Sequence, residues 1–219
     1  MEKIISSERH SHSLAQHNVL RNTYFLLALT LTFSALTACA STLLHLPAPG
    51  FILTLVGFYG LMYLTHRLAD RPVGILAAFA FTGFLGYCLG PILSRYLSVG
   101  MGETIAFALA GTAVVFFCCS AYVLTTRRDM SFLNGILITG FVVLLVAVIA
   151  NIFLKLPALQ MTISVLFILF SSAAILWETS NIVQGGETNY IRATVSLYVS
   201  LYNIFVSLLS LLGLASRND

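Results

Sequence analysis

Long intervals without a charged side chain limit most strictly what this chain can fold into. These intervals are 22–66, 72–94, 104–126, 130–154 and 193–216, and another, 157–183, is interrupted only by Glu178. A transmembrane helix needs about 20 mainly apolar residues to cross roughly 30 Å of hydrocarbon. A water-soluble domain has about 25% charged residues, whereas this chain of 219 residues has 9%. The sequence therefore predicts an integral membrane protein and excludes a soluble or disordered one.

Seven transmembrane helices are predicted from these intervals. The interval 22–66 is long enough for two helices, and Pro47-Ala48-Pro49-Gly50 in its middle is a strong turn signal. It therefore predicts a hairpin of helices over 24–46 and 51–65, while each other interval holds one helix. The alternation of a membrane β-barrel is absent from the sequence, so the predicted fold class is all-α. The predicted organisation is a flexible tail over 1–23, a seven-span membrane domain over 24–216 and a short end over 217–219.

Lysine and arginine residues near the span ends predict the orientation, because they concentrate on the cytoplasmic side. The side of the N-terminus has eight of them: Lys3, Arg9, Arg21, Arg67, Arg71, Arg127, Arg128 and Arg192. The other side has three: Arg95, Lys155 and Arg217. The N-terminus is therefore predicted in the cytoplasm and the C-terminus outside it. The net charge of +3 is too small and too scattered for a nucleic-acid-binding surface.

The N-terminal tail is predicted to be flexible because it lacks sustained apolar periodicity. Such a segment cannot bury enough apolar surface to offset the entropy lost on ordering. Its histidines, His10, His12 and His17, have no cysteine or carboxylate partners arranged for a metal. No metal site and no cofactor are predicted.

Small and polar residues at helical spacing predict which faces pack against protein. Gly83, Gly86 and Gly90 follow the spacing i, i+3, i+7 and predict a packing seam, because helices in lipid associate through small residues. One polar stripe on the last span consists of Ser196, Ser200, Asn203, Ser207 and Ser210, and one on the sixth consists of Ser164, Ser171 and Glu178. Polar groups in hydrocarbon are costly unless they face protein or water. Both stripes are therefore predicted to face inward, with the last helix central.

Glu178 is the only acidic residue well inside a predicted span. It lies about 7 Å from the end of its span, and Ser200 lies about 10 Å from the start of the next, at 1.5 Å per residue. The two can therefore face each other near the cytoplasmic side. One interpretation is a proton or cation site, and the other is an interfacial carboxylate that reaches water or an arginine. The residues leave both open.

No catalytic motif accompanies these features. The sequence has no Gly-x-Ser-x-Gly elbow, no His-Glu-x-x-His, and no pair of intramembrane carboxylates. The chain is therefore predicted not to be an enzyme.

Several stretches of the chain resemble a known family. They are Arg21-Asn22-Thr23-Tyr24, the run from Phe81-Thr82-Gly83 through Gly86 to Leu89-Gly90-Pro91, the block from Val115 through Cys118-Cys119 to Thr126, and Gly185-Gly186-Glu187-Thr188-Asn189-Tyr190-Ile191-Arg192. On these stretches the chain resembles the bacterial branch of the Bax inhibitor-1 family, also called the transmembrane Bax inhibitor motif proteins. The likeness extends over essentially the whole chain, and the last block is its most specific part.

The resemblance implies a bacterial inner-membrane protein in which the last helix is enclosed by the other six. It also implies association with the membrane-bound AAA protease FtsH and its HflK–HflC partners, tempering proteolysis of membrane proteins. On that interpretation the tail, with Glu2, Lys3, Glu8 and Arg9, is a handle that the protease grips.

Other family members are regarded as pH-sensitive calcium leaks, with aspartates facing each other on the sixth and seventh helices. These positions correspond to Glu178 and Ser200 here, and the following Asn203 is retained. One of the two carboxylates is thus replaced by a hydroxyl, which cannot share a proton and a cation in the same way. The resemblance therefore favours a protease modulator over the alternative, a calcium or proton leak with an incomplete carboxylate pair.

Overall fold

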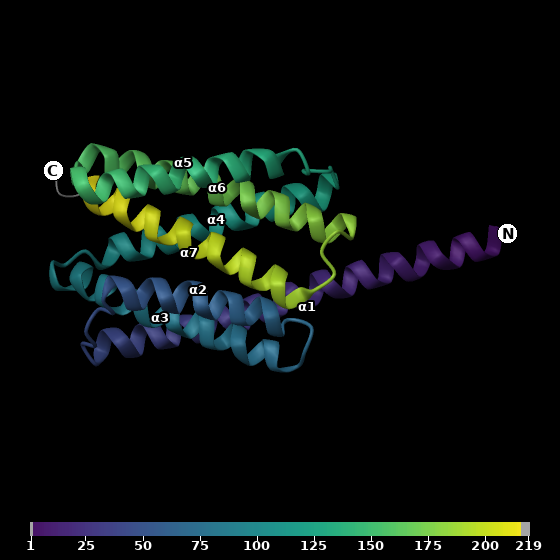
Figure 1. The fold of residues 1–219 in the computed structure, drawn as a ribbon, viewed down its shortest axis with the longest axis horizontal. Helices are drawn as coiled ribbons and strands as arrows, with labels where there is room; N and C mark the ends of the chain where they lie inside the picture. Colours follow the sequence, from purple (N-terminus) through teal and green to yellow (C-terminus); the bar gives the residue numbers. More distant parts are fainter. Residues whose placement is uncertain (1, 216–219) are drawn as a thin grey trace. The chain divides into compact units, whose positions relative to one another are not determined.

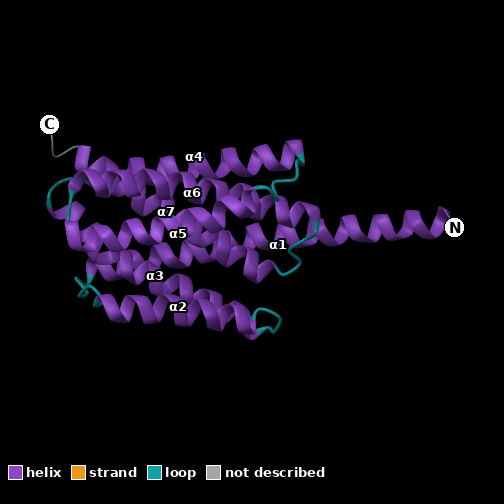
Figure 2. Cartoon of the chain, turned by 45° about the horizontal axis from the view of Figure 1, so that its top comes forward, coloured by secondary structure: helices purple, strands orange, loops and turns teal. Residues whose placement is uncertain are grey.

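The computed structural model describes the backbone of residues 2–215 and the side chains of residues 16–215. Within this range the chain is all-helical and contains no strand (Figure 2). Its helices, followed by colour in Figure 1, are α1 (Glu2–Leu43), α2 (Phe51–Leu68), α3 (Val73–Ser98), α4 (Gly102–Thr126), α5 (Leu133–Leu154), α6 (Pro157–Gln184) and α7 (Tyr190–Ala215). All seven of these helices are long and apolar enough to cross a membrane, so the predicted number of spans is confirmed.

The charged residues that interrupt the apolar intervals also end two of the helices. Arg127 follows α4 and Lys155 follows α5, and both adopt left-handed backbone conformations with φ of 49° and 50°. Their backbone N–H groups donate to the carbonyl oxygens of Val123 and Asn151, which is the usual way to satisfy the last turn of a helix. The span boundaries predicted from charge therefore coincide with real helix ends.

Helix α1 begins well before the membrane-spanning segment. Its apolar part is Gln16–Leu43, but the helical backbone starts at Glu2. Most of the expected tail is therefore helical, since extending an existing helix is far less costly than starting one. Its flexibility remains a prediction, and the side chains of the four proposed handle residues (Glu2, Lys3, Glu8 and Arg9) lie outside the described part. Residues 217–219 also lie outside it.

The chain divides into two compact units, which are described separately. The first consists of Met1–Pro91 and Asn181–Tyr198, and the second of Ile92–Ser180 and Val199–Asp219. In the second unit Val123, Met130 and Leu133 form a buried apolar cluster with Trp177 of α6 packed against it.

Helices α1 and α3 of the first unit meet along three glycines of α3. A Cβ atom built on Gly83 would contact the ring of Phe33 at 2.6 Å. One built on Gly86 would lie 2.3 Å from the carbonyl oxygen of Ser34, and one on Gly90 would lie 2.1 Å from Ser41 Oγ. The absence of a side chain at these positions is what allows the two helices to approach so closely.

A buried tyrosine joins α7 to the same pair of helices. Tyr198 is 2% exposed, and its hydroxyl forms hydrogen bonds with the Ser34 hydroxyl of α1 and the Thr82 carbonyl oxygen of α3. If the Ser34 hydroxyl donates to the Tyr198 oxygen, the Tyr198 hydroxyl can donate to the Thr82 carbonyl oxygen. Both hydroxyl protons then take part in hydrogen bonds. The core of the first unit thus combines close packing with a hydrogen-bond network in the hydrocarbon region.

Candidate functional site

The polar stripes of α6 and α7 are sheltered from the surface. Ser164, Ser171 and Glu178 are 3%, 1% and 5% exposed, and Ser200 and Ser207 are similarly buried. The remaining stripe residues, Ser196, Asn203 and Ser210, are half-buried. The prediction that both faces turn away from lipid is therefore confirmed.

Glu178 lies in a tightly packed part of α6. The next residues, Thr179 and Ser180, are buried as well. The Ser180 hydroxyl donates to the Arg128 carbonyl oxygen at 3.1 Å and accepts from the Met130 N–H at 3.0 Å, so the connection between α4 and α5 is fastened to this turn of α6. Glu178 is thus a buried carboxyl inside a spanning helix, and such a group is a candidate site for a proton or a cation.

The other two candidate ion-site residues lie on α7. Ser200 is 6% exposed. Asn203 lines a polar cavity together with Ser164 of α6 and Ser207 of α7. Within residues 16–215 no three His, Cys, Asp or Glu side chains come close enough together to hold a metal ion.

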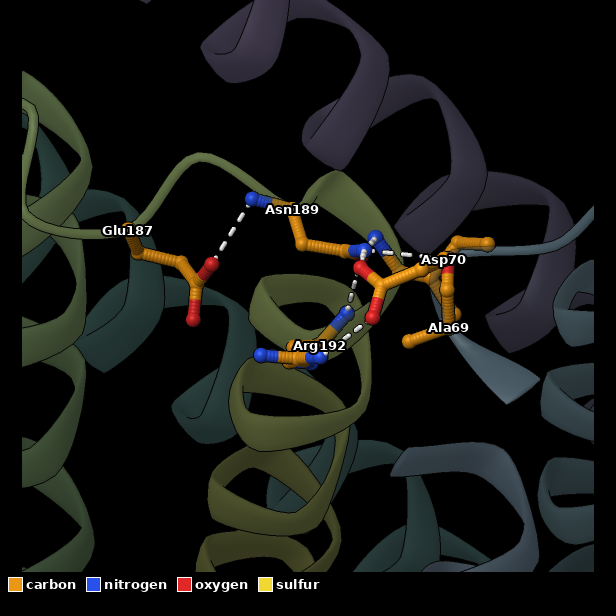
Figure 3. Close-up of polar contacts among 6 residues, drawn as sticks. Ala69, Asp70, Glu187, Asn189 and Arg192 are labelled. Carbon is orange, nitrogen blue, oxygen red and sulfur yellow. Dashed lines mark hydrogen bonds and ion pairs between the residues drawn. The ribbon is translucent and has the colours of Figure 1, made fainter. Parts of the chain in front are cut away.

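A polar cluster that sequence reasoning did not single out joins the turn after α2 to the start of α7. Figure 3 shows Asn189 with Glu187 on one side and Asp70 on the other, and Arg192 next to Asp70. The Arg192 guanidinium and the Asp70 carboxylate form an ion pair at 2.8 Å. The Asn189 amide donates to the Asp70 carboxylate at 2.9 Å and to the Ala69 carbonyl oxygen at 3.0 Å. We name Asp70, Asn189 and Arg192 the end latch.

Asn189 also caps α7. Its side-chain oxygen accepts from the N–H groups of Ile191 at 2.9 Å and Arg192 at 3.2 Å, which have no partner within the helix. The Glu187 carboxylate in turn accepts from the Asn189 N–H at 2.7 Å. One side chain therefore starts α7 and holds it to the turn between α2 and α3. The sequence pointed to this cluster only through the family-specific block that ends at Arg192. That block did not indicate which residue Arg192 contacts.

We expect Asn189→Ala to destabilise the protein by about 1–2 kcal/mol, because it removes the cap and both bonds to the turn. Asp70→Asn should cost less than about 1 kcal/mol, since the side chains of its ion pair are 39% and 70% exposed. Thermal unfolding of the two variants in detergent measures the difference. Equal losses for the two variants would contradict the expectation that Asn189 stabilises the latch more than the charge of Asp70 does.

These features define a multi-pass α-helical membrane protein with a sheltered carboxyl in α6 and a polar latch at the start of α7. A sequence model of the family described as inhibitor of apoptosis-promoting Bax1 matches residues 16–218. The chain belongs to this family, the Bax inhibitor-1 family, as its motifs indicated.

Relatives of known name extend this assignment. The chain is 71% identical over 219 residues to the "Modulator of FtsH protease YccA" of Escherichia coli strain K12, and the match covers 100% of both chains. Identity and coverage are the same for the "Inner membrane protein YccA" of Escherichia coli O6:H1. An uncharacterised protein of Pasteurella multocida is 59% identical over 200 residues, 91% of each chain. The name of the first relative is that of a protease modulator.

Proposed function

We propose that this protein is an inner-membrane modulator of the FtsH protease. The observation that supports this most strongly is the 71% identity, over the full length of both chains, to a protein named for that function. The proposed partners are FtsH and the HflK–HflC complex. The proposed orientation has the N-terminus in the cytoplasm and the C-terminus in the periplasm, with the last helix enclosed by the other six.

The mechanism we propose is occupation of the protease by a substrate that is slow to extract. The helical segment before Gln16 would be offered to the protease, because α1 begins at Glu2, ahead of the membrane span. Extraction would then have to separate α1 from α3 at the glycine seam and break the buried hydrogen bonds of Tyr198. A protein held by such packing unfolds slowly, so the protease stays engaged and other membrane substrates are spared.

Co-purification tests the partner. The protein carrying a C-terminal affinity tag is extracted from membranes in mild detergent, and the eluate is probed for FtsH and for HflK–HflC. We expect FtsH to be enriched relative to an equally tagged seven-span membrane protein of another family. Equal recovery with the two proteins would contradict the proposed function.

Deleting about the first 10–15 residues, a typical length for a frayed terminus, should leave the protein inserted but lengthen its lifetime several-fold. The physical reason is that the protease loses the segment it grips, while the packed helices are unchanged. Pulse-chase measurements with and without active protease record the lifetime. A tail of equal length made of glycine and serine is the control and should restore a normal lifetime. If the truncated protein disappears as fast as the full chain while the protease is active, the segment is not a handle.

Reporter fusions test the orientation. A reporter that is active only outside the cytoplasm should be active after Asp219 and inactive at Asp129, because eight of the eleven Lys and Arg residues lie on the side of the N-terminus. Activity at both positions, or at neither, would place both sites on one side and contradict an odd number of spans.

A further inference from the structure

A polar cavity of about 280 Å³ lies among α5, α6 and α7 in the second unit. Its polar lining includes Asn151, Gln160, Ser164, Asn203, Ser207 and Ser210. Gln160 and Ser210 also line a second hollow of about 520 Å³, beside Arg95 at the end of α3, so the two hollows adjoin. The cavity is far larger than the roughly 10–15 Å³ that a single water molecule needs.

The cavity extends deep along α7. Asn203 lies about 18 Å from the end of this helix at Ala215, at a rise of 1.5 Å per residue. The hydrocarbon core of a bilayer is about 30 Å thick, so polar lining reaches the middle of the membrane from the side where α7 ends. Polar groups persist at such a depth only where they face protein or a filled cavity.

Hydrogen bonds between lining residues of α5 and α6 fix part of the polar wall of the cavity. The Asn151 amide donates to the Gln160 side-chain oxygen at 2.7 Å, and the Ser164 hydroxyl donates to the Gln160 carbonyl oxygen at 3.0 Å. The Asn151 side-chain oxygen is buried and has no hydrogen-bond partner among the described residues. Leaving such a buried acceptor unpaired is unfavourable. Because the Asn151 residue lines the cavity, a small rotation of its amide would bring this oxygen within reach of a ligand hydroxyl.

The near absence of charged side chains in the described lining disfavours the binding of ions. Among the described residues no carboxylate lines either hollow, and the one charged lining side chain, Arg95, belongs to the second hollow. A cation that loses its hydration shell needs carboxylate or several carbonyl oxygens, and it would first pass Arg95. An anion attracted by Arg95 would find no positive charge further in.

The lining fits hydroxyl groups instead. Serine hydroxyls and amide side chains each offer both a donor and an acceptor, as a ligand hydroxyl does. Val148, Phe167 and Val206 supply an apolar wall for the carbon atoms. We infer that this cavity is a binding site for a small uncharged molecule with several hydroxyl groups, which enters through the hollow beside Arg95.

Thiol labelling tests this inference on the full chain in lipid nanodiscs, where both membrane faces are accessible. The four natural cysteines, Cys39, Cys88, Cys118 and Cys119, are replaced by alanine, and Ser207→Cys introduces a nearly isosteric thiol. Three methanethiosulfonate reagents are compared: hydroxyethyl (uncharged), trimethylammonium (cationic) and sulfonate (anionic). Val146→Cys on α5 is the matched control, because it is 61% exposed and lies about 12 Å from its helix end, as Ser207 does.

At Ser207→Cys we expect the uncharged reagent to react at least tenfold faster than either ionic one, and much faster than it reacts at Val146→Cys. Glycerol or a linear polyol of four to six carbons should slow labelling at Ser207→Cys but not at Ser131→Cys, an exposed position outside both hollows, which corrects for viscosity. Adding Asn151→Leu should abolish this protection and leave labelling intact.

Three results would overturn the inference. Equal rates at positions 207 and 146 would mean that the cavity is closed. A cationic reagent as fast as the uncharged one would indicate a cation path. Labelling that no polyol slows would mean a hydrated space without a binding site.

Discussion

Gly86→Ala is expected to lower the free energy of unfolding by about 3 kcal/mol, at the upper end of the usual cost of overpacking. The added methyl group would lie 2.3 Å from the Ser34 carbonyl oxygen and 2.1 Å from Thr37 Oγ1. The serine oxygen belongs to the backbone of α1, so the helix itself must move. For a domain of this size the change corresponds to a thermal midpoint roughly 6–12 °C lower.

A series of glycine substitutions separates packing from the intrinsic effect of alanine. Gly60→Ala adds a methyl group that meets nothing within 4 Å, so it should be neutral or stabilise by up to about 1 kcal/mol. Gly83→Ala should fall in between, because the Phe33 ring in its way can rotate. Thermal unfolding in one detergent ranks the three variants. A loss at Gly60 as large as that at Gly86 would refute the packing explanation.

Ser200→Asp is expected to turn a protein with little calcium flux into one with a measurable, acid-sensitive flux. Glu178 and Ser200 are 5% and 6% exposed, and the family resemblance pairs these two positions. One buried carboxylate cannot hold a divalent cation alone, whereas two can share it. Protonation at acid pH removes the charge that binds the cation, so the flux should depend on pH. Calcium-sensitive dye inside proteoliposomes measures the flux.

Two variants control this experiment. Ser207→Asp also places a carboxylate at a buried position of α7, but in an uncharged cavity, and it should conduct nothing. Adding Glu178→Gln to Ser200→Asp should abolish the flux, because the amide keeps the hydrogen bonds but loses the charge. A strong calcium leak from the unmodified chain would favour the calcium leak over modulation of the protease as the function of this protein.

The number and limits of the helices were accessible from the sequence because crossing hydrocarbon is a local requirement. Each span must supply its own apolar residues and satisfy its own backbone hydrogen bonds. The residues that interrupt the apolar intervals therefore predicted where α4 and α5 end, at Arg127 and Lys155. The start of α1 was missed for a related reason. The polar residues before the first span would not form a helix alone, but they are helical here because they continue the helix of that span.

Contacts between helices were decided only by the tertiary structure. Asn189 bonds to Asp70, 119 positions away, and Asn151 of α5 shares a cavity with Asn203 of α7. Spacing along one helix predicted that Gly86 faces protein, but not that it faces the backbone of α1 at Ser34. Such pairs depend on the rotation and register of each helix against its neighbours. Many weak contacts fix that arrangement together, so no single stretch of sequence contains it.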